Sequence, residues 1–226
     1  LLLDSLRYDT AMDPAIMPNR ATLRAEGAWA RVMPGFNASS AAAIRTAFTG
    51  RENAAVLAFV STFLKTDAGV ESVFHQLAEA GYRTAAYSSG FFMQFGDGVA
   101  YEKRLLYRCP PELEDATVDE ALAALNAGDY DVIVSHIGYT DTAAHDHGIG
   151  RPAYLAAFHR ADALIPRIRA RLPAGATLVV LGDHGHDELG RHSFGTDYAT
   201  FGVYCGPAFR RGFSIGTIGL PSHRYL

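Results

Sequence analysis

Cysteine is scarce in this sequence, which contains only Cys109 and Cys205 among its 226 residues. Two thiols so far apart in the chain cannot provide the paired cysteines of a CxxC zinc site. Whether they form a disulfide cannot be read from the sequence, because a disulfide depends on the distance between the two Cα atoms. A CxxC metal site is therefore excluded, and the redox compartment stays open.

Long hydrophobic runs and an excess of positive charge are missing as well. The longest apolar run, residues 54–64, is too short to cross a bilayer and includes Ser61 and Thr62. A net charge of −4 and a pI near 6.1 give no sign of a surface for nucleic acid or anionic membranes. No signal peptide is visible, which slightly favours a cytoplasmic location. The chain begins with Leu1 and not with Met, which leaves open whether residues are missing at either end.

Apolar residues, by contrast, make up 49% of the chain, enough for a sizeable core, and no repeat or linker divides it. We therefore expect a single domain over residues 1–226. Short apolar runs predict buried strands over residues 1–3, 83–87, 132–136 and 178–181. Amphipathic stretches predict helices over residues 18–26, 41–48, 70–80, 118–126 and 153–172. This alternation indicates an α/β domain of three layers with a central, mostly parallel sheet.

Carboxylates and imidazoles gather where the predicted strands end. Asp4 follows the first strand, and Asp183 and His184 follow the fourth. In open α/β sheets, ligands bind beyond the carboxyl ends of the strands. Seven of the nine histidines also fall in one quarter of the chain: His136, His145, His147, His159, His184, His186 and His192. The pattern predicts a metal or acid–base site at this edge of the sheet.

The segment Gly182-Asp183-His184-Gly185 is a fairly specific signal for such a site. Neighbouring side chains on a strand point to opposite faces, so Asp183 and His184 reach one metal ion only if the backbone turns here. The two glycines permit that turn. The alternative interpretation is an ordinary polar turn.

A second set of candidate ligands follows the third predicted strand. Asp141 and His145 are four residues apart, which places both on one face of a helix, and His192 is a candidate third ligand. An Asp, His and His set with one open position suits a catalytic zinc ion. His147 competes for the ligand role. Asp4, taken alone, is more readily a cap or turn residue than a ligand.

Ser39 and Ser40 lie just before an alanine-rich helix. Either serine would serve as the helix N-cap. A serine at this position also lies near free backbone N–H groups and the positive end of the helix dipole, which favour a phosphate group. A bound metal ion would lower the pKa of its hydroxyl, so that it becomes a nucleophile near neutral pH.

The order of these motifs resembles that of the alkaline phosphatase superfamily, from residue 1 to about residue 206. The motifs run in the order Asp4, Ser40 before Thr49-Gly50, Asp141-x-x-x-His145, Asp183-His184-Gly185 and His192. The distance to the Thr-Gly pair selects Ser40 over Ser39 as the family's nucleophile. Locally the chain is most similar to glycosylphosphatidylinositol ethanolamine-phosphate transferases. Asp4-Ser5-Leu6-Arg7-Tyr8-Asp9 resembles their Asp-Ala-Leu-Arg-x-Asp, and the segment from Asp141 to His145 resembles their Asp-Thr-x-Gly-His.

The resemblance implies two divalent metal ions, usually zinc, with manganese as the alternative. It assigns one ion to Asp141, His145 and His192, and the other to Asp4, Asp183, His184 and the Ser40 oxygen. Ser40 is the expected nucleophile, and the phosphoserine would then be hydrolysed or passed to an alcohol. Three further residues are expected to contact the substrate: Arg7, Arg45 and His186. The alternatives are a helix-surface role for Arg45 and a polar loop position for His186.

The expected function is therefore a metal-dependent phosphoric ester hydrolase, a phosphatase or phosphodiesterase, acting on a phosphorylated small molecule or lipid head group. One alternative is a transferase that moves phosphoethanolamine or a similar group to an alcohol. Another is a degenerate member of the fold that binds a phosphorylated ligand without turnover. A sulfatase is not expected, because Ala42 and Ile44 stand where the Cys/Ser-x-Pro-x-Arg frame needs Pro and Arg.

Overall fold

The computed structural model describes residues 1–35, 39–51, 71–105, 108–192 and 199–220. In these residues the strands are β1 (Leu2–Leu3), β2 (Ala28–Met33), β3 (Thr84–Ser89), β4 (Ala100–Leu105), β5 (Val132–Ile137), β6 (Leu178–Gly182), β7 (Thr200–Cys205) and β8 (Phe213–Gly219). The α-helices are α1 (Tyr8–Met12), α2 (Pro18–Glu26), α3 (Ser40–Thr49), α5 (Val73–Glu79), α6 (Pro111–Ala127), α7 (Tyr139–His147), α8 (Pro152–Asp162) and α9 (Leu164–Arg169), and η1 (Gly90–Gly98) is a 3₁₀ segment.

The described strands form one eight-stranded sheet in the order β4-β3-β5-β1-β6-β7-β2-β8. Strand β7 runs antiparallel to its neighbours β6 and β2, and the other described pairings are parallel. The predicted central, mostly parallel sheet is confirmed. The sheet is buried on both sides around β1, which explains why the segments of β5 and β6 are almost continuously apolar.

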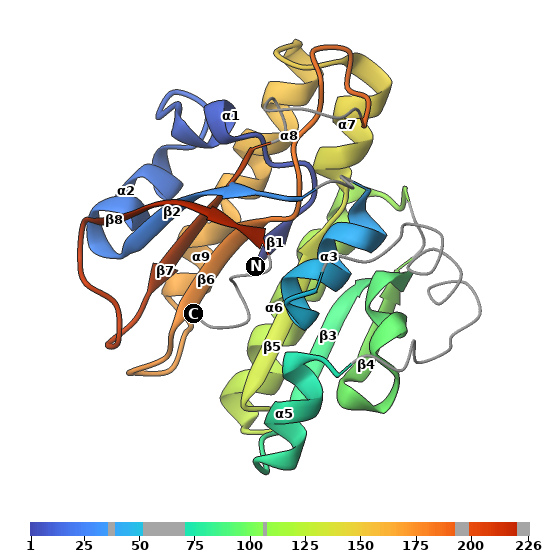
Figure 1. Cartoon of the computed structure of the whole chain (residues 1–226), viewed down its shortest axis with the longest axis vertical. Coiled ribbons are helices and arrows are strands. Elements are labelled where there is room, and N and C mark those ends of the chain that lie inside the picture. The colour runs from blue at the N-terminus through green and yellow to red at the C-terminus, as the bar shows by residue number, and fades with distance from the viewer. Residues whose placement is uncertain (36–38, 52–70, 106–107, 193–198, 221–226) are drawn as a thin grey trace.

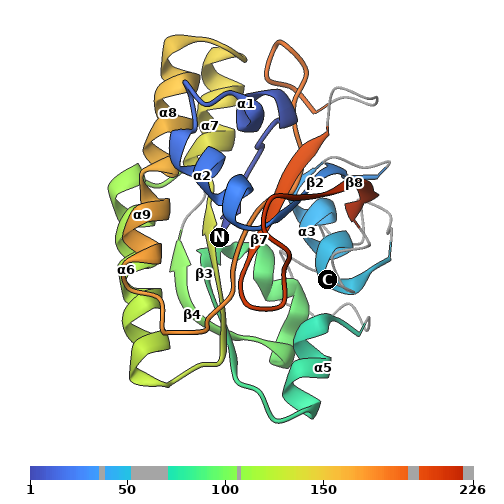
Figure 2. The ribbon, with the colours of Figure 1, turned by 90° about the vertical axis from the view of Figure 1, so that its left-hand side faces the viewer.

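Helices cover both faces of this sheet (Figures 1 and 2). Helices α6, α8 and α9 pack on one face and α3 and α5 on the other. Leu2 and Leu3 are adjacent in β1, so their side chains point to opposite faces. Leu3 lies in the core beneath α8, with Phe158, and Leu2 lies in the core beneath α3, with Ile44. The three-layer prediction is therefore confirmed.

Several predicted boundaries differ from the observed ones. The predicted helix over residues 153–172 is divided into α8 and α9 at Ala163. Pro166 lies in the first turn of α9 and has no N–H to continue the hydrogen bonds of α8. Helix α6 begins at Pro111, seven residues before the predicted start, because proline suits the first turn of a helix. The helix predicted over residues 70–80 corresponds to α5, which begins at Val73. Residue 70, its predicted start, lies outside the described residues.

The carboxyl ends of β1, β5 and β6 meet at one edge of the sheet. β1 lies between the other two, with Leu3 opposite Ile137 and Gly182. Gly182 is required by close packing, since a Cβ there would lie 1.9 Å from Thr200 Oγ1. The residues that follow these three strands therefore lie side by side. An apolar cavity of about 460 Å³ is lined by Leu1, Leu2 and residues of β5 and β6, and it includes none of the candidate metal ligands.

The described part of the chain contains no helix that is both long and apolar enough to cross a membrane.

Candidate metal centre

Asp4, Asp183 and His184 are brought together because β1 and β6 are parallel neighbours that end at the same level. His184 Nε2 lies 3.2 Å from Asp4 Oδ1 and 3.5 Å from Asp183 Oδ2. The Nδ1 atom of the same ring lies 3.0 Å from the carbonyl oxygen of Gly185, which can only accept a hydrogen bond. Nδ1 therefore carries the proton, and Nε2 faces the two carboxylates, as metal-binding imidazoles require.

Ser40 joins this group from the opposite side. It is the first residue of α3, and its Oγ donates to Asp4 Oδ1 at 3.1 Å and lies 3.1 Å from His184 Nε2. The neighbouring Ser39 occupies the N-cap position. The structure thus places at one point the four residues that the resemblance assigned to one ion: Asp4, Ser40, Asp183 and His184.

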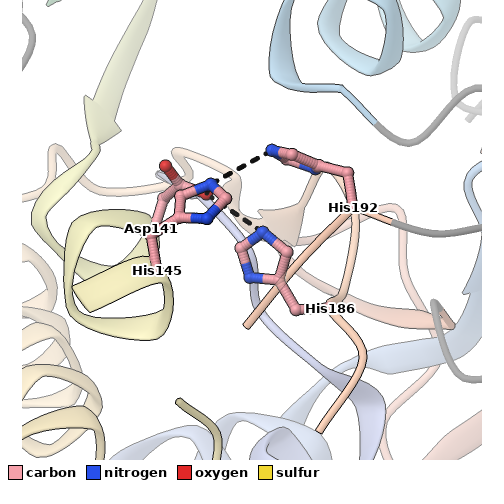
Figure 3. Close-up of side chains that lie close together, drawn as sticks. All are labelled: Asp141, His145, His186 and His192. Carbon is pink, nitrogen blue, oxygen red and sulfur yellow. Dashed lines mark hydrogen bonds and ion pairs between the residues drawn. The ribbon is translucent and has the colours of Figure 1, made fainter. Parts of the chain in front are cut away.

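A second cluster lies beside the first and consists of Asp141, His145, His186 and His192 (Figure 3). Asp141 and His145 lie on one face of α7, as predicted, with His145 Nε2 3.4 Å from Asp141 Oδ1. His192 Nε2 lies 3.2 Å from His145 Nε2. Asp141 also groups with Asp4 and His184, so the two clusters are adjacent. His147, the competing ligand, is exposed and lies outside both clusters.

Ser5 links the two clusters, although it is not among the candidate residues predicted from the sequence. Its side chain is fully buried and its φ is +61°. The backbone N–H of Ser5 donates to Asp183 Oδ1 at 3.1 Å, and its Oγ donates to Asp141 Oδ1 at 2.6 Å. One feature of the sequence points to Ser5. It is the position at which Asp4-Ser5-Leu6-Arg7 differs from the Asp-Ala-Leu-Arg of the family that the chain resembles.

Other buried groups hold the ligands in place. His136 Nε2 lies 3.1 Å from Asp4 Oδ2, and Thr140 Oγ1 donates to the Asp4 carbonyl oxygen at 2.7 Å. Glu114 of α6 accepts the backbone N–H groups of Gly138 and Tyr139, at 2.5 and 3.1 Å, and so caps the N-terminus of α7. His136, one of the seven clustered histidines, thus contacts the Asp4 carboxylate from the end of β5.

Arg7 is predicted to contact substrate, but here it makes ion pairs within the protein. Its Nε and Nη2 atoms donate to Asp9, and Nη1 donates to Glu188 at 2.8 Å and to the His186 carbonyl oxygen at 3.4 Å. Arg7 therefore braces the loop that carries His186. Arg45 is buried in α3, five residues after Ser40, which places it on a different face of that helix.

The charges of the first cluster influence one another strongly. Burial raises the pKa of Asp4, but hydrogen bonds from His136 and His184 bring it well below its usual value. Burial and the Asp4 carboxylate raise the pKa of Asp183 to about 7. Burial lowers the pKa of His184, but Asp183 and Asp4 overcome this effect and raise it to about 10. Without a metal ion, this cluster therefore retains protons at neutral pH.

The second cluster is different. Burial, followed by the Asp4 charge, raises the pKa of Asp141. Burial and the neighbouring imidazoles of His184, His192 and His145 lower the pKa of His186 to about 2. His186 is therefore a neutral imidazole, the form that binds metals.

The donor set fits divalent cations. Asp4, Asp141 and Asp183 are three carboxylates buried within one small volume, and burying such charges without a counter-charge is costly. Asp183 Oδ2 accepts no hydrogen bond from the described residues, and His186 Nδ1 likewise has no hydrogen-bond partner there. Buried polar atoms normally have partners. Carboxylate oxygens and imidazole nitrogens are ligands for zinc and manganese alike.

A model of the family described as Type I phosphodiesterase / nucleotide pyrophosphatase matches residues 58–201, more than half of the chain. The chain belongs to this family. The matched range includes the candidate ligands from Asp141 to His192, whereas Asp4 and Ser40 precede it. Human GPI ethanolamine phosphate transferase 3, catalytic subunit, is 24% identical over 127 residues, which cover 54% of this chain and 12% of that protein. The chain spans 12% to 22% of the lengths of the curated relatives it matches.

Solved structures confirm that the fold is alkaline phosphatase-like. Murine ectonucleotide pyrophosphatase / phosphodiesterase 5 superposes with a TM-score of 0.76 at 13% identity, over 100% of this chain and 93% of that one. An alkaline phosphatase superfamily protein from Vibrio parahaemolyticus gives a TM-score of 0.70 at 14% identity, over 98% of this chain and 62% of that one. Membership of the Type I phosphodiesterase / nucleotide pyrophosphatase family and the alkaline phosphatase-like fold are thus established together.

Proposed function

We propose that this chain is a metal-dependent phosphoric ester hydrolase that acts through a phosphoserine formed on Ser40. One observation carries the proposal: the Ser40 hydroxyl lies 3.1 Å from both Asp4 Oδ1 and His184 Nε2, in a buried group of ligand-type side chains. Asp4, Asp183 and His184 would hold one divalent ion with Ser40, and Asp141, His145 and His192 would hold the other. Zinc is the expected metal, with manganese as the alternative.

Two divalent ions, when bound, lower the pKa of the nucleophile and stabilise the attacking and leaving oxygens of an in-line displacement. The protein's own contribution begins with α3. The first backbone N–H groups of this helix have no acceptor inside it, so a phosphate group can bind there next to Ser40 Oγ. The bond from Ser40 Oγ to phosphorus forms while the bond to the leaving alcohol breaks. Water then attacks the phosphoserine and releases phosphate or a phosphate monoester.

The substrate is expected to be a phosphorylated small molecule or a lipid head group. Transfer to an acceptor alcohol is the second candidate reaction, and the similarity to human GPI ethanolamine phosphate transferase 3 favours it. In that reaction an alcohol, instead of water, attacks the phosphoserine. The nucleophile and its partners are the same in both reactions, so the proposed site does not depend on which acceptor is used.

Turnover of 4-nitrophenyl phosphate and bis(4-nitrophenyl) phosphate by zinc- or manganese-loaded protein tests this proposal. We expect the wild type to hydrolyse at least one of them and Ser40→Ala to lose turnover while keeping its fold by circular dichroism. Ser39→Ala removes the adjacent hydroxyl and is the matched control; it should stay active. Turnover that appears only with an added alcohol would favour the transferase. Full activity in Ser40→Ala would refute the phosphoserine.

A further inference from the structure

The sequence predicts three protein ligands and one open position around Asp141, but the structure brings a fourth donor, His186, to the same point. We propose that His186 is the fourth protein ligand of the ion held by Asp141, His145 and His192. The inference rests on the proposed metal-dependent function, and it concerns the coordination of one of its two sites.

The spacing of the donor atoms fits four ligands around one ion. Asp141 Oδ1 lies 3.3 Å from His186 Nε2 and 3.4 Å from His145 Nε2, and the Nε2 atoms of His145 and His192 lie 3.2 Å apart. A tetrahedral zinc ion with bonds of about 2.0–2.1 Å keeps its ligand atoms roughly 3.3 Å apart. The four donor atoms all lie within 4.8 Å of one another. His186 therefore lies at the distance from Asp141 that a ligand would have.

The orientation of His186 does not suit a contact with substrate. Its side chain is completely buried, and Nε2 points toward Asp141 and Ser5 Oγ, which lies 3.3 Å away. Figure 3 shows its ring turned toward those of His145 and His192 instead of away from the cluster. A buried imidazole among other imidazoles is unfavourable unless a shared partner satisfies their nitrogens.

The backbone presents His186 and His192 as a pair. The two residues flank a turn in which the Asp187 N–H donates to the Arg191 carbonyl oxygen at 3.0 Å, and the Asp187 carboxylate accepts the backbone N–H groups of Leu189 and Arg191. The ring centroids of His186 and His192 are consequently 4.7 Å apart. The turn that positions the predicted ligand His192 thus also positions His186.

A fourth protein ligand leaves room for the reaction at this ion, because catalytic zinc sometimes expands to five ligands in the transition state. A substrate oxygen would then be the fifth ligand of the ion at Asp141. The Asp4, Asp183 and His184 site, which also holds Ser40, has three protein side chains besides the nucleophile.

Zinc affinity of metal-free protein, measured by competition with a chromogenic chelator, tests the assignment. His186→Ala and His186→Gln should each weaken the binding of one zinc ion by more than about 100-fold, which exceeds the usual effect of removing an outer-shell partner. His192→Ala provides the benchmark for losing a predicted ligand, and the exposed His147→Ala is the control that should bind like wild type. The proposal would be overturned if folded His186 variants bound both zinc ions with the affinities of the wild type.

The visible spectrum of cobalt-loaded protein and a zinc-edge anomalous map of wild-type crystals give readouts that do not depend on turnover. We expect the cobalt bands to change in His186→Gln but not in His147→Ala, and the anomalous peak to lie about 2.0–2.1 Å from His186 Nε2. A peak on Asp141, His145 and His192 with His186 turned away would refute the fourth ligand. If zinc binds as expected but no phosphate ester is turned over, the proposed function fails and the fourth ligand stands.

Discussion

At the residue scale, Ser5 makes the connection between the two candidate metal sites. Its backbone N–H fixes Asp183 and its hydroxyl fixes Asp141, so one residue orients a carboxylate of each site. We predict that Ser5→Ala folds but binds zinc about 10- to 100-fold more weakly, as is typical when an outer-shell partner is removed. Metal-competition titrations of purified protein, with circular dichroism to check the fold, measure this loss.

Ser5→Gly is the matched control for backbone strain. Position 5 has a φ of +61°, which glycine adopts freely and alanine does not. Both variants lose the hydroxyl, so both should lose the same zinc affinity, while Ser5→Gly should be more stable than Ser5→Ala by about 1 kcal/mol. Unchanged zinc affinity in either variant would show that the hydroxyl does not orient Asp141.

Site residues that belong to a recognisable sequence motif could be predicted. Residues that reach the site only through packing between distant elements could not. Asp183 and His184 could be identified because they follow an apolar strand between two glycines, and the structure brings them to Asp4 and Ser40. Glu114 lies on α6, 24 residues before Gly138, whose backbone N–H it accepts, and it caps α7 only because α6 packs beside β5. No local pattern encodes that contact.

At the scale of elements, the turn between His186 and His192 depends on a close approach to α7. Gly190 has a φ of +73°, and a Cβ there would lie 1.9 Å from the Ala144 carbonyl oxygen, in the same helix as His145. We predict that Gly190→Ala pushes the turn away from α7 and weakens the binding of zinc. It should also cost about 1–3 kcal/mol beyond the strain of the positive φ. Zinc titration and urea unfolding measure the two effects.

Gly150→Ala separates backbone strain from the clash. Gly150 has a φ of +71°, but a Cβ there would meet nothing within 4 Å. This variant should lose only about 1 kcal/mol of stability and keep its zinc affinity. Equal zinc affinities for the two alanine variants would mean that the approach of the turn to α7 does not position His192.

Strands that form a distinct apolar run in the sequence could be predicted. Strands that depend on pairing with distant parts of the chain could not. The strands near the centre, β5 and β6, are largely apolar runs that are buried or half-buried along their length, and they were predicted almost to the residue. Strand β8 lies at the edge of the sheet with most of its residues exposed or half-exposed, so no apolar pattern marks it. Strand β7 is formed by pairing with β6 and β2, which lie far from each other in the chain.

At the scale of the whole molecule, the candidate ligands come from distant parts of the chain. Asp4 follows β1, Ser40 begins α3, Asp141 lies on α7, and His184 follows β6. Only the folded chain brings these residues together, so a metal ion binds the folded state much more tightly than the unfolded state. Metal binding therefore stabilises the fold. The metal is thus expected to act as a link across the sheet.

We predict that chelation lowers the melting temperature of metal-loaded protein. At free zinc 100 times the Kd, one site adds about 2.7 kcal/mol, or roughly 5–10 °C for a chain of this size. Differential scanning calorimetry with and without chelator measures the shift. Asp183→Asn keeps the size of the side chain but removes its charge, so this variant should show a smaller shift. Equal melting temperatures with and without metal would show that the metal does not stabilise the fold.

The rise in melting temperature caused by zinc should also depend on pH, because zinc competes with protons for the same side chains. Without metal, the raised pKa values of His184 (about 10) and Asp183 (about 7) favour the protonated groups in the folded state. Their contribution to stability is present below the unfolded values of 6.5 and 3.8 and is lost as the pH rises through the folded ones. The lowered pKa of His186, about 2, acts in the opposite sense: its contribution is present above pH 6.5 and is lost as the pH falls toward 2. Zinc replaces the protons on His184 and Asp183, so the metal-induced shift should be small at pH 5 and grow steadily up to pH 8. A shift that is largest at pH 5 would mean that these two residues are not the ones the metal binds.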